Sequence, residues 1–313
     1  MKLIIQIPCR NEEKTVGLTL SQLPRKLEGV DVVEWLVIDD GSSDRTVEEA
    51  KYAGVDHIVR LNRPRGLAAA FMAGLRASLE AGADIIVNTD ADNQYRAGSL
   101  PDLIRPVLEK KADMVIGERP IDRTPHFSYI KKKLEKLGSL AVRIVSGADV
   151  PDAASGFRAM SRKTAARLNV FSAYTYTLET IIQAGQKGMS VSSVPVKTNP
   201  PTRPSRLVKS VPGYIGRSVM TIARIFAVYR PFVFFTALGM ALMVPGVVIG
   251  LRFLYFFFFT SSSGGHIQSL IFACILIIMG FQSILSAFIA DLLSVNRRML
   301  EDLQYKDREK RAG

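Results

Sequence analysis

Two hydrophobic patterns alternate along residues 1–196. Short apolar runs of strand length are interleaved with longer segments whose apolar residues recur at helical spacing. The short runs predict strands at Leu3–Ile7, Trp35–Ile38, His57–Leu61, Ile85–Val87, Met114–Ile116 and Val191–Val196. The longer segments predict helices at Asn11–Leu27, Arg45–Ala53, Gly66–Ala81, Ala97–Lys111, Phe127–Val145, Arg162–Leu168 and Tyr174–Gln186. This alternation indicates an α/β fold, in which helices cover both faces of a mostly parallel sheet.

The last third of the chain has a different pattern, with two long uncharged runs. Pro231–Leu251 contains 21 residues without a charge, and Ile267–Ala290 contains 24. At about 1.5 Å per helical residue, each run can cross the ~30 Å hydrocarbon core of a bilayer. We therefore expect a hairpin of two transmembrane helices at residues 231–252 and 267–290. The aromatic run Phe253–Phe259 is typical of a membrane interface.

Positive charge is concentrated beside these apolar runs. The formal net charge is +12, and residues 197–230 contain seven Lys and Arg but no acidic residue. Residues 291–313 form a second basic segment. Because basic residues flank membrane helices on the cytoplasmic side, we expect both termini and the α/β part to be cytoplasmic, with the loop at residues 260–268 outside. The charge is not accompanied by an aromatic-basic recognition motif, so nucleic acid is not an expected partner.

Two further segments combine basic and apolar positions. Residues 119–145 carry seven Lys and Arg against two acids, and a helix there would gather apolar residues on one face. That face would hold Leu134, Leu137, Ala141, Ile144 and Val145, with Lys131, Lys132, Lys133 and Lys136 supplying charge. Such a helix is typical of a membrane surface, but a solvated basic helix packed on the core has the same pattern. Residues 207–230 predict a juxtamembrane helix along the interface.

The strongest candidate for chemistry follows the predicted strand Ile85–Val87. Asp90 and Asp92 are two positions apart at its carboxyl end, so their side chains can point to the same side. Two close carboxylates repel each other unless a positive charge lies between them. A hard divalent cation fits, since Mg²⁺ takes one or two carboxylates together with substrate phosphates. The alternative is an acidic surface turn, because so short a motif also occurs by chance.

Four short motifs occur in order in the first part of the chain. They are Ile7-Pro8 with Asn11-Glu12-Glu13, VIDDGSSDRT at residues 37–46, DADNQ at 90–94 and SGFR at 155–158. This series resembles the family 2 glycosyltransferases, which have a GT-A (Rossmann-like) fold. It is most similar to the branch of dolichol-phosphate mannosyltransferases and polyprenyl-phosphate glycosyltransferases, over residues 1–206. The chain has no QxxRW motif, which argues against a processive polysaccharide synthase.

The resemblance implies roles for the residues at matching positions. It implies nucleotide binding by Pro8, Glu12, Asp39 and Asp40. It implies cation and diphosphate binding by the catalytic acids Asp90 and Asp92, together with Gln94. On the acceptor side it implies catalytic roles for Asp152 and Arg158, and binding of the acceptor or its phosphate by Ser155 and by the late-segment residues Arg203, Ser205 and Arg206. The chain departs from the family pattern at Arg10, where an aromatic residue is common, at Asn93, and in the late segment TRPSR.

The resemblance also implies an activity. The chain would transfer a sugar from a UDP- or GDP-hexose to a polyprenyl phosphate, dolichyl or undecaprenyl, with inversion and with Mg²⁺ or Mn²⁺. Positive side chains at Arg119, Arg123, Lys133 and Arg203 could hold the lipid phosphate. Asp152 is either a general base or a structural turn residue.

Other classes of protein remain possible at this point. One is a non-catalytic membrane scaffold with a transferase-like nucleotide-binding domain, and another is a transferase with a different lipid acceptor. A sugar nucleotidyltransferase is disfavoured because Pro8–Glu13 contains no glycine. The sequence leaves open the sugar, the base, the polyprenyl chain and the oligomeric state.

Overall fold

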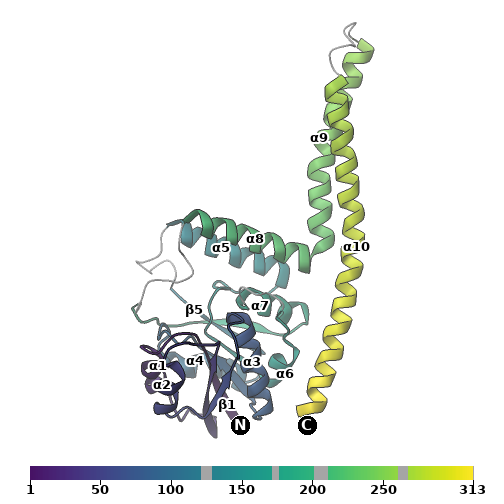
Figure 1. Cartoon of the computed structure of the whole chain (residues 1–313). Coiled ribbons are helices and arrows are strands. Elements are labelled where there is room, and N and C mark those ends of the chain that lie inside the picture. Colours follow the sequence, from purple (N-terminus) through teal and green to yellow (C-terminus); the bar gives the residue numbers. More distant parts are fainter. Residues whose placement is uncertain (121–128, 171–175, 201–210, 260–266, 313) are drawn as a thin grey trace. The chain divides into compact units, whose positions relative to one another are not determined.

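In the computed structural model, which describes residues 1–120, 129–170, 176–200, 211–259 and 267–312, the first part of the chain forms a seven-stranded mixed sheet (Figure 1). The strand order is β3-β2-β1-β4-β6-β5-β7. The strands are β1 (Lys2–Cys9), β2 (Val32–Asp39), β3 (His57–Arg60), β4 (Ile85–Asn88), β5 (Met114–Glu118), β6 (Arg158–Ser161) and β7 (Val191–Pro195). The predicted α/β class is confirmed.

The helices follow the predicted series. They are α1 (Val16–Gln22), α2 (Thr46–Tyr52), α3 (Leu67–Glu80), α4 (Leu100–Leu108), α5 (Tyr129–Ser146), α6 (Arg162–Arg167), α7 (Thr177–Gln186), α8 (Val211–Tyr229), α9 (Pro231–Phe259) and α10 (Ile267–Ala312), with a short 3₁₀ turn at Ala97–Ser99. The chain divides into two compact units, residues 1–219 with 301–313 and residues 220–300.

Both faces of the sheet are covered by helices, as its alternating side chains require. On β1, Leu3, Ile5 and Ile7 point into a core shared with α1 and α4. The intervening residues face α3, which packs on β1 and β2. Gly74 of α3 allows this close approach, because a side chain there would overlap the amide of Gln6. The buried strands therefore carry apolar residues on both faces.

One strand was not predicted. Residues 158–161 form β6, which runs antiparallel between β4 and β5, whereas the other four strand pairs are parallel. No hydrophobic pattern predicts a strand there, because four residues are too few to show a period. The insertion brings Arg158, at the start of β6, opposite Asn88 at the end of β4.

The first helix is shorter than predicted. It ends at Gln22 because Leu23 precedes Pro24 and adopts an extended conformation, with φ −73° and ψ 137°. Residues 12–15 form turns in place of the expected first helical turn. Likewise α4 ends at Leu108, and Lys110 two residues later has a left-handed φ of 55°.

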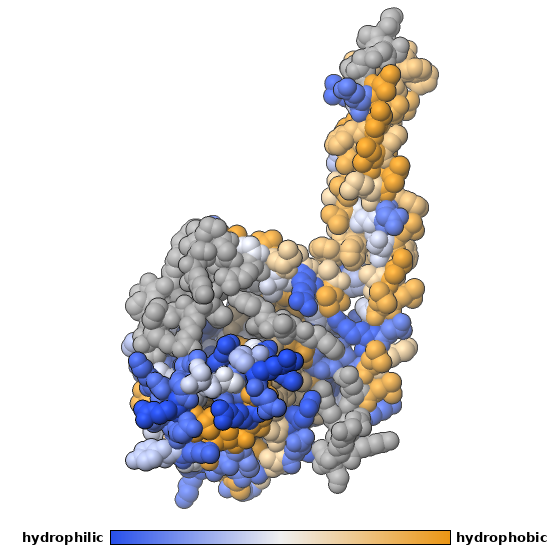
Figure 2. Space-filling model, viewed as in Figure 1, coloured by the Kyte–Doolittle hydropathy of each residue, from blue (hydrophilic) through white to orange (hydrophobic). Residues whose placement is uncertain are grey.

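The second unit contains the two apolar helices. Pro231–Phe259 spans 29 residues and Ile267–Leu303 spans 37, and each contains an 18-residue stretch with a mean hydropathy of 2.3. The surface of these helices is largely apolar (Figure 2). Small residues bring the helices together, since a side chain at Gly280 would lie 2.7 Å from the carbonyl oxygen of Gly239. Their length and composition suit two membrane spans, as predicted.

The end of α10 differs from the predicted separate tail. The helix continues unbroken from the apolar part to Ala312, and its last residues belong to the first unit. There the buried carboxylate of Glu301 forms an ion pair with Lys187, whose Nζ lies 3.0 Å from Oε2. The Arg167 guanidinium lies 4.6 Å from the centre of the Tyr305 ring. We call residues 301–312 the C-terminal arm.

Candidate active site

The predicted functional residues gather at one edge of the sheet. Parallel pairing aligns Cys9 with Asp39 and Gln6 with Asn88, so β1, β2 and β4 end at the same edge. Asp90 and Asp92 follow β4 there, and both are half-buried. This is the edge at which open α/β sheets bind ligands.

The Asp90 carboxylate lies directly against the turn at Ser155–Gly156. A side chain at Gly156 would place its first carbon 2.9 Å from each Asp90 oxygen, so the absence of a side chain there makes room for the carboxylate. Burial raises the pKa of Asp90 to about 7, and the charge of Asp92 adds to this shift, while Arg119 and Arg158 oppose it. A positive charge bound beside Asp90 would offset both causes of this shift.

The donor set suits a divalent cation of the Mg²⁺ or Mn²⁺ kind. Asp90 and Asp92 supply hard carboxylate oxygens, and Gln94 follows in the same turn. The described residues contain no group of three or more His, Cys, Asp or Glu side chains arranged around a single point. A cation here would thus keep several positions for water or phosphate oxygens, as Mg²⁺ does in phosphate-binding sites.

A buried polar network holds the turn at Gly156 in its place against Asp90. The amide of Asn88 donates to the carbonyl oxygen of Gly156 (2.9 Å) and to the hydroxyl of Tyr176 (2.8 Å), and accepts from Gln6 (2.9 Å). Tyr176 also stacks on Phe71 at 3.9 Å between ring centres. The network joins β1, β4, α3 and α7 to the turn at Gly156, so its position is fixed by four elements.

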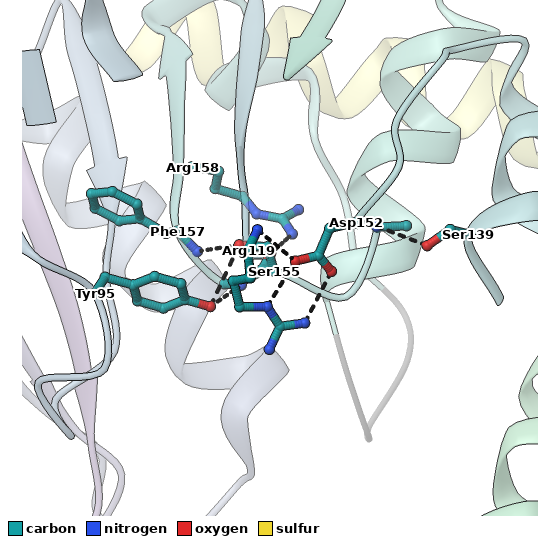
Figure 3. Close-up of polar contacts among 9 residues, drawn as sticks. Tyr95, Arg119, Ser139, Asp152, Ser155, Phe157 and Arg158 are labelled. Carbon is teal, nitrogen blue, oxygen red and sulfur yellow. Dashed lines mark hydrogen bonds and ion pairs between the residues drawn. The ribbon is translucent and has the colours of Figure 1, made fainter. Parts of the chain in front are cut away.

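Tyr95 holds the same turn from the other side. Its hydroxyl accepts from the Gly156 N–H at 3.1 Å and lies 3.4 Å from the Ser155 hydroxyl, and its ring stacks on Phe157 (Figure 3). Burial raises the pKa of Tyr95 to about 12, so the phenol stays protonated. The predicted acceptor-side residue Ser155 is thus brought close to the predicted cation-binding turn.

Asp152 and Arg119 form a bidentate ion pair. Arg119 Nε lies 2.7 Å from Asp152 Oδ2 and Nη2 lies 2.9 Å from Oδ1, and the Arg119 backbone N–H donates at 3.2 Å (Figure 3). The side chains are 11% and 1% exposed. This geometry favours the structural interpretation of Asp152 over the general base, because both carboxylate oxygens are engaged by one guanidinium.

The place of Arg158 argues against the predicted direct role in catalysis. The side chain is fully buried, and its Nη1 donates to the Thr177 carbonyl (3.1 Å) and the Thr180 hydroxyl (2.5 Å). Its Nη2 donates to the Ser155 carbonyl. A guanidinium enclosed in this way supports the turn before β6 and ties it to α7 without reaching a substrate.

Asp39 and Asp40, predicted to bind nucleotide, are buried at the end of β2. Asp39 accepts from the Ser42 N–H at 2.9 Å, and Arg60 Nε lies 3.2 Å from its other oxygen. Asp40 accepts from the N–H groups of Arg65 (2.6 Å) and of Gly66 (2.9 Å). The two carboxylates thus shape the loop beside the sheet edge, and their nucleotide role stays a prediction.

The same loop needs a glycine after Asp40. Gly41 has φ +67°, and a side chain there would come within 2.9 Å of the Pro64 nitrogen. Glu12 is also buried beside this loop, with Thr15 Oγ1 donating to Oε2 at 3.0 Å, and Pro8 lies buried in β1. Pro8, Glu12, Asp39 and Asp40 therefore come together at the β1–β2 side of the edge, and their predicted binding of a nucleotide stays a prediction.

Some predicted residues are not part of this cluster. Lys133 is exposed on α5. Arg123, Arg203, Ser205 and Arg206 lie outside the described residues. The predictions for these five residues therefore stay untested.

Four residues that build the site have no role in any of the sequence motifs. They are Asn88, Tyr95, Tyr176 and Asn199. Asn88 and Tyr95 could have been suspected, since each lies beside the DADNQ motif and a buried polar side chain needs a partner. Tyr176 and Asn199 carried no signal, because their partners are distant in the sequence.

Sequence comparison supports one family. The family described as Glycosyl transferase family 2 matches residues 4–168. An undecaprenyl-phosphate mannosyltransferase of Micrococcus luteus is 29% identical over 234 residues, covering 72% of this chain and 93% of the relative. A UDP-N-acetylglucosamine–dolichyl-phosphate N-acetylglucosaminyltransferase of Methanococcus voltae is 28% identical over 217 residues, covering 61% and 83%.

Structural comparison gives the same fold. A glucosyl-3-phosphoglycerate synthase from Mycobacterium tuberculosis, solved with Mn²⁺, UDP and glucosyl-3-phosphoglycerate, superposes with a TM-score of 0.55 and 20% identity. The match covers 72% of this chain and 79% of that one. At this identity the likeness establishes the arrangement of strands and helices, and the residues above carry the chemistry.

Proposed function

Because the chain belongs to glycosyl transferase family 2 and is a glycosyltransferase, we propose that it moves a sugar from a nucleotide-sugar donor to a polyprenyl phosphate at the membrane. The donor would be a UDP- or GDP-hexose, a divalent cation would assist, and the reaction would invert the anomeric centre. The catalytic unit and both termini would face the cytoplasm, where basic residues flank the two spans.

One observation carries this proposal. The two carboxylates after β4 and the turn at Ser155–Gly156 form a single site, since the Asp90 carboxylate lies against Gly156. Residues expected to bind the diphosphate and residues expected on the acceptor side therefore meet at one point. A non-catalytic scaffold would not need a carboxylate of raised pKa packed against this turn.

The proposed reaction is a direct displacement. An oxygen of the acceptor phosphate forms a bond to the anomeric carbon, and the bond from that carbon to the nucleoside diphosphate breaks, with the electron pair leaving on the diphosphate. Attack from the opposite face inverts the configuration. A phosphate monoester is already anionic near neutral pH, so no side chain has to accept a proton. This agrees with an Asp152 carboxylate that is held by Arg119.

A divalent cation bound there would neutralise the charge that develops on the leaving diphosphate. Asp90 and Asp92 would hold it, with Gln94 as a further ligand. The chain's own part is to fix these ligands. The network of Asn88 and Tyr95 around Gly156 does this without contacting the substrate.

The surface of α5 supports a membrane-bound acceptor. Ala141, Val142 and Val145 are buried, as a helix packed on the first unit requires. A second face exposes Leu137 (49%), Leu140 (48%) and Ile144 (54%), beside the exposed basic residues Lys133, Lys136 and Arg143. Apolar side chains rimmed by positive charge suit an anionic lipid surface.

The test is transfer by the purified full-length chain. We expect one member of a panel of radiolabelled UDP- and GDP-hexoses to label a polyprenyl phosphate, and EDTA to abolish this. Asp92→Asn should keep the fold and lose transfer. Asp102→Asn is the matched control, since its side chain is 60% exposed on α4. Full activity in EDTA, without residual bound metal, would contradict the cation role.

A second pair of variants tests the acceptor surface. Leu140→Glu should raise the KM for the lipid acceptor by about tenfold or more, since inserting a leucine is worth ~1.5–3 kcal/mol. The donor Kd should not move. Leu18→Glu is the matched control, because Leu18 is 47% exposed on α1. A loss of donor binding with an unchanged acceptor KM would show that α5 serves the nucleotide side or the core.

A further inference from the structure

A short segment after β7 pairs with the turn that carries the candidate cation ligands. Thr198 and Tyr95 form an isolated antiparallel bridge. The Arg96 N–H donates to the Lys197 carbonyl at 3.2 Å, and the Lys197 N–H donates to the Ser99 hydroxyl at 3.3 Å. Residues 197–199 thus run along residues 93–99, about a hundred positions away in the chain.

Asn199 makes three hydrogen bonds to this turn. Its backbone N–H donates to the Gln94 carbonyl at 2.8 Å. Its side-chain amide donates to the Asn93 carbonyl at 2.9 Å, and its side-chain oxygen accepts from Arg96 Nε at 3.1 Å. Both ends of the side chain are therefore engaged by residues 93–96, one by the Asn93 backbone and one by the Arg96 side chain.

The turn needs outside support. Asn93 has a left-handed φ of 56°, which a non-glycine residue adopts at a cost. Residues 89–94 belong to neither helix nor strand, and the Gln94 N–H donates to Asp92 Oδ1 at 3.1 Å. Because Asp92 and Gln94 flank Asn93, a rotation at Asn93 would change the distance between the two candidate ligands.

We propose that Asn199 is a positioning residue for the cation site, which holds the backbone of Asn93 and Gln94 so that Asp92 and Gln94 face the same ion. The inference rests on the proposed function, because it needs a divalent cation at these ligands. Asn199 itself is not a ligand, since its amide and its oxygen are engaged by Asn93 and Arg96. It acts through the turn.

The test measures Mn²⁺ binding directly, by electron paramagnetic resonance on the full-length chain in detergent, in parallel series with UDP and with GDP. Asn199→Ala removes both side-chain hydrogen bonds and should weaken Mn²⁺ binding by about tenfold. Asn199→Ser should act in the same direction. In the transfer assay the half-saturating Mn²⁺ concentration should rise, while kcat at saturating Mn²⁺ stays close to that of the unaltered chain.

The matched control is Ser190→Ala. Ser190 also makes two side-chain hydrogen bonds, from the Asp113 N–H (3.0 Å) and to the Lys111 carbonyl (3.4 Å), at the opposite end of β5 and β7. Its loss should lower the melting temperature of the metal-free chain as much as Asn199→Ala does, with Mn²⁺ binding unchanged. Equal weakening of Mn²⁺ binding in both variants would overturn the proposal by showing a general loss of stability.

Two further results are distinguishable. If the unaltered chain binds Mn²⁺ and Asn199→Ala binds it equally well, the role of Asn199 is wrong and the proposed function stands. If the unaltered chain binds no Mn²⁺ in either nucleotide series, the cation site itself is wrong, and both proposals fail together.

Discussion

Replacing Gly156 by alanine should damage the site through one steric contact. The added carbon would lie 2.9 Å from both Asp90 oxygens and 3.1 Å from the Tyr176 hydroxyl. The backbone at Gly156 does not have the left-handed φ that favours glycine, so alanine fits the backbone itself. The whole effect must therefore come from displacement of Asp90 or of the turn.

The structure sets the size of the effect. The contacts below 3.0 Å are with the Asp90 oxygens, so the carboxylate has to shift. The other two parts of the site are held in place, because Tyr176 stacks on Phe71 and the turn is hydrogen-bonded to Asn88. Overpacking of this kind costs about 1–3 kcal/mol. If the displaced carboxylate is a cation ligand, this cost also raises the activation free energy of transfer, and each ~1.4 kcal/mol lowers the rate tenfold. We expect kcat/KM to fall by about 10- to 100-fold.

The assay compares transfer and melting temperature for Gly156→Ala with Gly17→Ala as the control. Gly17 lies in α1 with no atom within 4 Å of an added carbon and with no left-handed φ, so alanine there should leave transfer unchanged. A Gly156→Ala chain with activity within about twofold of the unaltered chain would refute the reasoning, because it would show that the position of the Asp90 carboxylate beside Gly156 does not matter for transfer.

Three other predictions follow from the structure. Asp152→Asn should lower the free energy of unfolding by about 3–5 kcal/mol, because it removes the carboxylate that pairs with the buried Arg119 guanidinium. In a double-mutant cycle with Arg119→Gln, fully additive effects on the free energy of unfolding would contradict an interaction between the two side chains. Because the pKa of Asp90 is raised from about 4 to about 7 in the folded chain, the metal-free chain should lose stability as the pH rises through this range. Melting curves recorded in EDTA should show a smaller loss of stability for Asp90→Asn than for the unaltered chain. With the native cysteines replaced, a cysteine at Ser262 should react with an impermeant maleimide in intact cells, and one at Ala312 only after permeabilisation; the reverse pattern would refute the cytoplasmic placement.

The sequence predicted those parts of the fold that a local pattern determines. The strands β1, β2 and β4 are mostly apolar because both of their faces are buried. Residues 231–251 of α9 and 267–290 of α10 are uncharged, as helices that span a bilayer require. The strand β6 was missed, because four residues beginning with a buried arginine do not look like a strand. Its partners β4 and β5 determine it, and they are distant in the sequence.

For the site too, the sequence predicted only what a local motif determines. Asp90 and Asp92 could be placed from one motif at the end of one strand. The roles of Arg158 and Asp152 could not, since burial by α7 and pairing with Arg119 are properties of the folded chain. A motif identifies which residues recur together, and the structure decides which of them reach a substrate.

The C-terminal arm makes the first unit discontinuous in the sequence, and this affects protein engineering. A soluble fragment cut before α8 would lose Glu301 and Tyr305, so the Lys187 ammonium and the Arg167 guanidinium would each lose a contact with the arm. A better fragment would rejoin residues 301–312 to the catalytic unit through a flexible linker that replaces α9 and the apolar part of α10. The contribution of the arm could be measured separately, by adding a synthetic peptide of residues 301–312 to the fragment that lacks it.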